Sequence, residues 1–208
     1  KNSDVYKYST NNKNDLFIIN LRYTDRPDID DYPNIKRHLV KFKALLSDRS
    51  RTGTLESAFN NGYWYVMSTS RRVNMDSTKI VAPQRSTTNI FGYNEVPWYA
   101  MSDVFFITQK DKLISLRYIL ALANSKLYYL WLYHRGKRKG EVLELIGNPL
   151  SEIPIKKISK DEQKPFIGLV DKILAITSAP GYNPKNPPEE QELLGGMALF
   201  RGTTHWPF

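Results

Sequence analysis

The 208-residue sequence contains no cysteine, and this absence excludes several classes of site. Disulfide bonds, thiolate-bound metals, zinc fingers and cysteine nucleophiles all need a residue that the chain does not have. A chain without disulfides is also typical of a reducing compartment. We therefore expect a cytoplasmic location.

Long apolar runs and nucleotide-binding motifs are missing as well. The longest apolar stretches, residues 118–123 and 127–133, are far shorter than the roughly 18 residues that cross a bilayer. Neither a Walker pattern nor a GxGxxG occurs, which argues against a nucleotide site. Residue 1 is Lys and no signal peptide follows it, so we expect an excised piece of a longer protein.

Metal-ligating and catalytic clusters are scarce. His38, His134 and His205 stand far apart, and none has a ligand partner at helical spacing. Carboxylates cluster at two places. Those at residues 28–31 precede an expected helix, and those at residues 189–192 lie in an expected tail. We therefore expect no metal site and no catalytic residue within this chain.

Two short patterns share letters with catalytic motifs but lack their context. Pro27 and Asp28, with residues 162–164 (EQK), match a nuclease motif, yet neither lies on an expected strand. Residues 183–188 (NPKNPP) resemble an amino-methyltransferase signature, but Glu189 replaces the aromatic residue that would stack on the target base. Both matches are interpreted as coincidence.

What the sequence does contain is a concentrated positive charge. The chain has 30 Lys and Arg against 21 Asp and Glu, a net charge of +9. Residues 32–140 hold 18 basic and 6 acidic groups (net +12), whereas residues 1–31 and 141–208 carry −1 and −2. A basic surface of this strength attracts polyanions, of which nucleic acid is the commonest. Plain solubility is the alternative reading.

Periodicity predicts a mixed chain. Residues 1–15 read as coil and residues 16–21 as a strand, and a helix begins at Pro33 and runs to about residue 46. Residues 47–62 read as a loop with a helical turn. Short strands are expected at residues 63–67, 79–82 and 104–108, joined by the long loops 68–75 and 83–94.

Two helices are expected toward the C-terminus. The first is almost apolar all round, spans residues 115–134, and has Ser115 and Gly136 as its caps. The second begins at Ser159 with the spacing of a capping box, and Pro165 is expected to interrupt it. The fold class is therefore α+β: a small irregular β-sheet with flanking helices and two long C-terminal packing helices.

Five segments, in one order, carry a resemblance to a known family. They are YPNIKRHLVKFKALLSDRS (32–50), KIVAPQRS (79–86), YILALANSKLYYLWLYHRGKRKGEVLEL (118–145), IPIKKIS (153–159) and DEQKPFIGLVDKIL (161–174). Together they resemble the TaqI-like C-terminal specificity domain, the target recognition domain of type IIG restriction-modification enzymes and related adenine-specific DNA methyltransferases. Their order also resembles one half of a type I specificity subunit.

The resemblance implies sequence-specific recognition of double-stranded DNA. It divides the chain into an N-terminal coil and strand (1–31), a target recognition domain (32–158), a C-terminal scaffold helix (159–178) and an irregular tail (179–208). The implied partners are double-stranded DNA and a methyltransferase or nuclease domain of the same or a partner chain. This chain would hold no cofactor, while the parent enzyme would use S-adenosylmethionine for adenine N6 methylation, and Mg²⁺ if it also cleaves.

Recognition of this kind needs cations for phosphates and planar polar groups for base edges. The phosphate candidates lie on an expected helix face or between glycines: Lys36, Arg37, Lys41, Lys43, Lys137, Arg138 and Lys139. The base-reading candidates lie in the long loops: Arg71, Arg72, Asn74, Gln84, Arg85 and Asn89. A further group of aromatic residues could stack on bases, but most of them are expected in the core: Tyr63, Trp64, Tyr65, Trp98 and Tyr99.

Two other functions stay open at this point. The chain could be a protein-interaction module whose apolar helices dock a catalytic subunit, with an incidental basic face. It could also be an autonomous nuclease, in which Asp28 or Glu162 would bind Mg²⁺.

Overall fold

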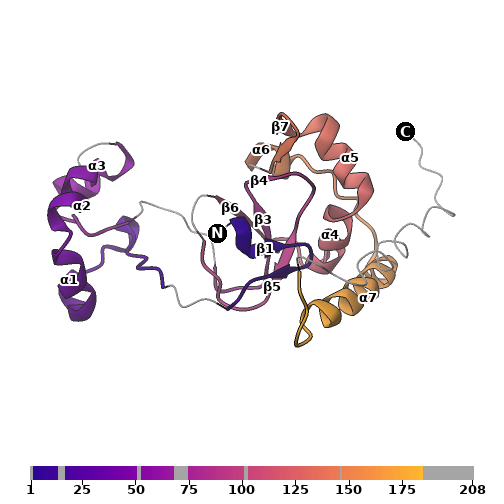
Figure 1. The fold of residues 1–208 in the computed structure, drawn as a ribbon, viewed down its shortest axis with the longest axis horizontal. Helices are drawn as coiled ribbons and strands as arrows, with labels where there is room; N and C mark the ends of the chain where they lie inside the picture. The colour runs from indigo at the N-terminus through magenta and orange to yellow at the C-terminus, as the bar shows by residue number, and fades with distance from the viewer. Residues whose placement is uncertain are drawn as a thin grey trace. The chain divides into compact units, whose positions relative to one another are not determined.

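The computed structural model describes residues 2–13, 17–50, 53–67, 75–100, 103–145 and 147–184. The chain forms two compact units (Figure 1). The larger unit contains Lys1–Asn14 and Asn74–Phe208, and the smaller unit contains Asp15–Val73. The smaller unit is thus inserted in the sequence of the larger one. The domain boundaries expected from the sequence stay a prediction.

The smaller unit is helical in its described part. Its elements are η2 (Tyr23–Asp25), η3 (Ile29–Asp31), α1 (Pro33–Val40), α2 (Lys43–Ser50), η4 (Gly53–Leu55) and α3 (Glu56–Asn60). Pro33 occupies the first turn of α1, as predicted. The single helix expected to residue 46 is two helices, and the loop expected at 47–62 contains further helical turns.

Two strands expected in this unit do not form over their described residues. Residues 17–20 are irregular, and Leu21 only accepts a backbone hydrogen bond from Met67 N at 2.8 Å. Residues 63–67 form a turn and irregular backbone. Their aromatic side chains pack into a small core around Leu39, Ala58 and Val66 instead. The apolar residues that resemble a strand in the sequence are therefore buried in this core without forming backbone hydrogen bonds of a β-sheet.

Three small antiparallel sheets lie in the described part of the larger unit. Its strands are β1 (Val5–Tyr6), β2 (Ser9–Thr10), β3 (Lys79–Pro83), β4 (Arg85–Ser86), β5 (Gly92–Asn94), β6 (Val104–Thr108), β7 (Lys137–Lys139) and β8 (Val142–Glu144). They pair as β1-β2, β5-β3-β6 and β4-β8-β7. The expected strands at 79–82 and 104–108 are confirmed, whereas residues 1–15, expected as coil, contain the 3-10 turn η1 (Asn2–Asp4) and the β1-β2 hairpin.

The helices of the larger unit are α4 (Leu116–Ala123), α5 (Lys126–Arg135), α6 (Gly147–Ser151) and α7 (Lys160–Thr177). Helices α4 and α5 lie beside the strands, and α7 packs against α4 (Figure 1). The predicted cap at Ser115 is confirmed, since its side chain accepts from Arg117 N. The helix expected over 115–134 breaks at Asn124, whose side chain bonds both the N–H and the carbonyl of Phe91 at 3.0 and 2.8 Å.

The predicted capping box of α7 is also confirmed. Ser159 N donates to Glu162 Oε2 at 2.8 Å, and Ser159 Oγ accepts from Glu162 N at 3.3 Å. The interruption expected at Pro165 is wrong, because α7 is one helix through that residue. The ring of Pro165 lies in the second turn of α7. The helix continues beyond it and buries Val170 and Ile173.

Gln163 joins the first turns of α4 and α7. Its buried amide accepts from Ser115 N at 2.9 Å and donates to the carbonyls of Leu113 and Ile158 at 2.8 and 3.2 Å. One side chain thereby satisfies three backbone groups. The two helices are fixed to each other at this end.

The core of the larger unit lies between sheet β5-β3-β6 and helices α4, α5 and α7. Ile80 from β3 and Phe91, which directly precedes β5, meet Leu120, Leu132 and Ile173 from the helices, and all five are fully buried. Gly92 of β5 lies close against the N-terminal hairpin, because a Cβ there would be 2.5 Å from Ser9 O. Only glycine permits this approach.

A polar network ties the N-terminal segment to this sheet. Lys79 is fully buried, and its Nζ donates to Ser77 O, Asn94 Oδ1 and Val96 O at 3.0, 3.1 and 2.9 Å. Asn94 Nδ2 in turn donates to Thr10 Oγ1 and Asn12 Oδ1 at 2.8 and 2.9 Å. Burial lowers the pKa of the Lys79 ammonium.

The described elements, helices with small antiparallel sheets, confirm the α+β class. Among the residues that the structure describes, no helix is long and apolar enough to span a membrane.

Candidate nucleic-acid interface

The sheet β4-β8-β7 gathers cations from two distant parts of the sequence. Its register places Arg85, Glu144 and Lys137 side by side across the three strands. Because side chains alternate along a strand, Lys139 shares their face, whereas Arg138 points to the opposite face. β7 is the edge strand, and all three of its residues are exposed.

Glu144 lies between two of these cations. Its carboxylate pairs with Arg85 Nη2 at 3.3 Å and with Lys137 Nζ at 3.2 Å. The Glu144 side chain is 10% exposed, while those of Arg85 and Lys137 are 52% and 64% exposed. The hydrogen bond from Lys137 is the main cause of the lowered pKa of Glu144. One carboxylate thus holds two exposed cations on a common surface.

Arg138 and the hairpin tip complete this surface. The Arg138 guanidinium lies over the ring of Tyr133, 3.9 Å from the ring centroid. Tyr133 belongs to the last turn of α5. β7 and β8 are joined by the two-residue turn of Gly140 and Glu141, with Gly140 at φ +61°. Such a turn favours glycine at a positive φ. Residues 136–140, interpreted from sequence as a basic segment between glycines, are therefore mostly a β-hairpin strand.

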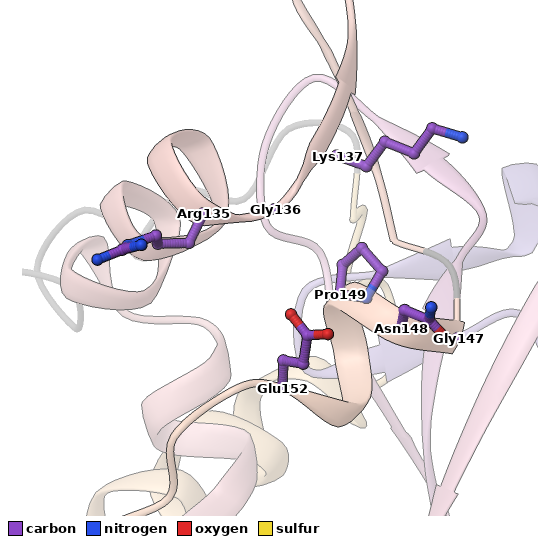
Figure 2. Close-up of a pocket in the computed structure, with 7 residues that line it drawn as sticks. All are labelled: Arg135, Gly136, Lys137, Gly147, Asn148, Pro149 and Glu152. Carbon is purple, nitrogen blue, oxygen red and sulfur yellow. The ribbon is translucent and has the colours of Figure 1, made fainter.

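A hollow of about 540 Å³ opens beside the hairpin. Its lining residues are Arg135, Gly136, Lys137, Gly147, Asn148, Pro149 and Glu152. Figure 2 shows the Arg135 and Lys137 side chains extending in opposite directions, with the Glu152 carboxylate pointing toward the space between them. The two cations do not converge on one point, so this hollow is no anion site by itself.

The cations predicted in the smaller unit are distributed over α1 and α2. Lys36 pairs with Asp30, and Arg37 Nη2 donates to Asn34 Oδ1 at 2.8 Å. Lys41 is exposed, and Lys43 Nζ lies 5.3 Å from the Trp64 ring centroid. All four cations belong to one short helical stretch, but two of them are held by local partners.

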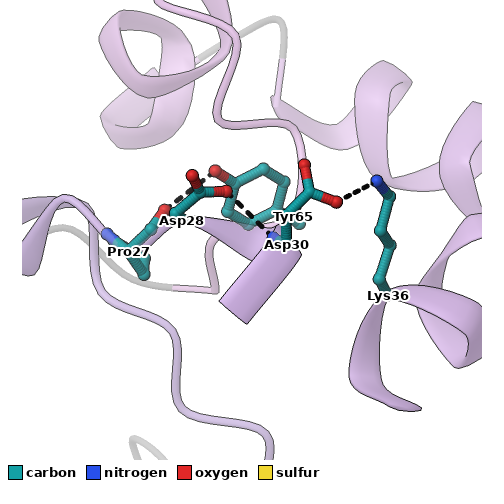
Figure 3. Close-up of polar contacts among 5 residues, drawn as sticks. All are labelled: Pro27, Asp28, Asp30, Lys36 and Tyr65. Atoms are coloured by element: carbon teal, nitrogen blue, oxygen red, sulfur yellow. Dashed lines mark hydrogen bonds and ion pairs between the residues drawn. The ribbon is translucent and has the colours of Figure 1, made fainter. Parts of the chain in front are cut away.

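The acidic residues that precede α1 have structural partners, as Figure 3 shows. Asp28 Oδ1 accepts from Asp30 N at 2.9 Å, and Tyr65 Oη donates to Pro27 O at 2.9 Å. The hydrogen bond from Lys36 to Asp30 raises the pKa of Lys36. Asp28, the aspartate of the nuclease-like letters, therefore caps a 3-10 turn.

The predicted base-reading residues fall into three groups. Arg71, Arg72 and Asn74 lie outside the described residues. Arg85 is exposed on β4 and pairs with Glu144, and Gln84 is half-buried beside it.

Asn89 is the third case. It is buried, and its Nδ2 donates to the carbonyls of Ala123 and Ser125 at 2.6 and 2.9 Å. Its amide supports the junction of α4 and α5, which argues against the base contact predicted for it.

The expectation for the aromatic residues is confirmed. Tyr65 and Trp98 are buried, and Tyr63 and Trp64 pack against the core of the smaller unit. Tyr99 is the exposed member of the set, and its hydroxyl donates to Asp76 Oδ1.

Sequence reasoning missed two residues of this surface. Arg135 is exposed at the end of α5, one residue before the glycine that precedes β7. Its place in the run HRGKRK was an available signal. Glu144 has no local signal, because its pairing with Arg85 joins residues 59 positions apart.

No group of three His, Cys, Asp or Glu residues in the described part of the chain is arranged to hold a metal ion. His38 lies against Phe42 and His134 against Tyr133, with ring centroids 5.5 and 5.1 Å apart. His205 lies outside the described residues. Both described histidines are exposed and contact aromatic rings.

Comparison with known proteins gives two kinds of match. The family model of the TaqI-like C-terminal specificity domain matches residues 2–155. The type II methyltransferases M.HincII and M.HindII of Haemophilus influenzae are each 37% identical to this chain over 70 residues, which cover 32% of this chain and 14% of each relative. The chain thus matches a small part of much longer proteins. Because the family model covers most of its length, the chain belongs to the TaqI-like C-terminal specificity domain family.

Proposed function

We propose that this chain recognises a specific double-stranded DNA sequence as the specificity domain of a restriction-modification enzyme. The observation that carries the proposal is the exposed cationic strand β7, beside Arg85, in a member of a specificity-domain family. Cations on an exposed sheet edge can reach phosphates without the cost of desolvating a core. The methyltransferase names of the two relatives agree with this role.

The proposal assigns the chemistry to other parts of the enzyme. A methyltransferase domain of the same or a partner chain would use S-adenosylmethionine to methylate adenine N6 after flipping the base out of the duplex. A nuclease domain, as in type IIG enzymes, would add Mg²⁺-dependent cleavage. The chain described here would hold the duplex and select the site.

Binding through phosphates has a measurable signature. If 6 to 10 cations contact phosphates, affinity falls roughly 10³- to 10⁵-fold between 50 and 200 mM salt. The test incubates the chain with a randomised duplex pool at these two salt concentrations and sequences the retained DNA. An enriched motif with steep salt dependence supports the proposal, and no retention at low salt contradicts it.

Charge-matched variants separate a DNA surface from general basicity. Replacing Lys137, Arg138 and Lys139 together by Ala removes three charges from β7. The control replaces the exposed Lys157, Lys160 and Lys172 by Ala, which removes three charges around α7. We expect the first variant to lose far more DNA affinity than the second, with both variants shown to be folded by circular dichroism. Equal losses would mean that β7 is no dedicated DNA surface.

A protein-interaction module is the second candidate function. Leu127 and Leu130 lie one turn apart on α5 and are 57% and 52% exposed, although Tyr128 and Leu132 of the same helix are buried. Replacing both leucines by Glu would abolish binding to a separately produced methyltransferase domain if this face docks it, and would leave DNA binding unchanged. Unchanged docking would remove this candidate.

A further inference from the structure

Arg138 occupies a special place on the β7-β8 hairpin. Its cross-strand partner Leu143 is buried in the core, so Arg138 lies on the inner side of the sheet. Because β7 is the edge strand, the Arg138 side chain passes beyond the core and remains exposed. It comes to lie over Tyr133, a half-buried residue of the adjoining helix α5.

The ring of Tyr133 holds the Arg138 guanidinium above its face. At 3.9 Å from the ring centroid, the guanidinium is within cation–π distance. In the described part of the chain no carboxylate or carbonyl pairs with Arg138. This arrangement differs from that of Arg85, whose Nε and Nη2 are directed at Glu144. A guanidinium that is held by an aromatic ring, and not by a carboxylate, keeps its N–H groups available for an acceptor on the DNA.

The N–H groups of an arginine that is held in position match the major-groove edge of guanine best. Guanine presents O6 and N7 as paired acceptors in the major groove, and arginine is the commonest residue to bind both. The same groove admits a two-stranded β-ribbon, and the β7-β8 hairpin, with its tight turn at Gly140, has this form.

We propose that Arg138 reads a guanine in the major groove, held in position by the ring of Tyr133. This inference rests on the proposed function and gives Arg138 a role different from the phosphate contact predicted from the sequence. Lys139, on the opposite face of the same strand, keeps the phosphate role. Tyr133 acts through Arg138 and is a positioning residue.

The experiment selects duplexes from a randomised pool with the 208-residue chain and its variants, and compares motif and affinity. We expect a guanine at one position of the wild-type motif. Arg138→Lys keeps the charge but loses the planar fork, so preference for guanine at that position falls about 5- to 150-fold while the salt dependence stays the same. Lys139→Ala is the matched control, and it weakens all sequences alike and reduces the salt slope by about 0.9.

Two variants test the role of the ring. Tyr133→Leu removes the π-face, and we expect the guanine preference to fall about 2- to 5-fold, the range of an exposed cation–π contact. Tyr133→Phe keeps the face and is expected to keep the preference. A merely structural role for Tyr133 would lower thermal stability without changing base preference.

The possible failures are distinguishable. If the wild-type chain enriches a motif that Arg138→Lys and Arg138→Ala leave unchanged, Arg138 does not read a base, and the inference is wrong while the proposed function stands. If the wild-type chain retains no duplex at low salt, the proposed function fails and the inference fails with it.

Discussion

Replacement of the buried Lys79 by Met gives the most direct test of the reasoning about this fold. Met keeps most of the apolar stem and therefore leaves little cavity, but it removes the three hydrogen bonds that Nζ donates. Hydrogen bonds from a charged donor contribute about 1.5–3 kcal/mol each. Val96 is exposed and Ser77 half-buried, so water can replace part of this loss at their carbonyls.

We therefore expect Lys79→Met to lower the free energy of unfolding by about 2–4 kcal/mol, which corresponds to a Tm about 5–15 °C lower for a unit of this size. The measurement is urea denaturation followed by circular dichroism. Lys172→Met, at an exposed position of α7, is the control and should change stability by no more than about 0.5 kcal/mol. If Lys79→Met were as stable as the wild type, the three hydrogen bonds would only balance the cost of burying the ammonium.

The difference in unfolding free energy between the wild type and Lys79→Met should depend on pH with a definite sign. Burial lowers the pKa of Lys79 in the folded chain below its ordinary value of 10.5. Between the two pKa values the unfolded chain binds more protons than the folded one, so stability rises with pH. The wild type should gain stability relative to Lys79→Met as the pH rises toward 10.5, and a falling difference would contradict the burial of a charged group here.

Three further changes test other parts of the structure. Ser159→Ala removes the cap of α7 and should lower the free energy of unfolding by about 1 kcal/mol in urea titrations, while Ser159→Asp should restore it. Gln163→Leu leaves Ser115 N and two carbonyls without their partner and should lower it by about 2–4 kcal/mol; a neutral effect would refute the bridging role. Since its cation partners lower the pKa of Glu144 below 4.5, their stabilising effect is present above pH 4.5 and is lost as the pH falls through the folded pKa. The stability difference between wild type and Glu144→Gln should therefore shrink in acid denaturation below pH 4.5, and a constant difference would contradict the ion pairs.

Elements with local signals were predictable from the sequence. Ser159 and Glu162 specify the start of α7 by bonding each other's backbone, and Pro33 is preorganised for the first turn of α1. The exposure of Lys137, Arg138 and Lys139 was predictable for a similar reason, because three cations between two glycines are typical of a surface segment. Their contact with phosphates stays a prediction.

Elements that depend on distant partners were not predictable. The β1-β2 hairpin is short and polar, and bonds from Asn94 to Thr10 and Asn12 hold it. The break between α4 and α5 comes from the pairing of Asn124 with Phe91, which lies 33 positions away. Asn89 looked like a base-reading residue because the sequence does not reveal that it is buried.

Trp98 gives the architecture of the larger unit an evolutionary consequence. Its Nε1 donates to Asn11 O at 3.0 Å, and its backbone N donates to Met75 O at 3.1 Å. The chain therefore leaves the larger unit and re-enters it at the two sides of one residue. Neighbouring exit and entry points let an inserted segment be exchanged without unravelling its host. Residues 15–73 form such an inserted segment, and the hydrogen bonds of Trp98 hold together the two points of the larger unit between which it is inserted.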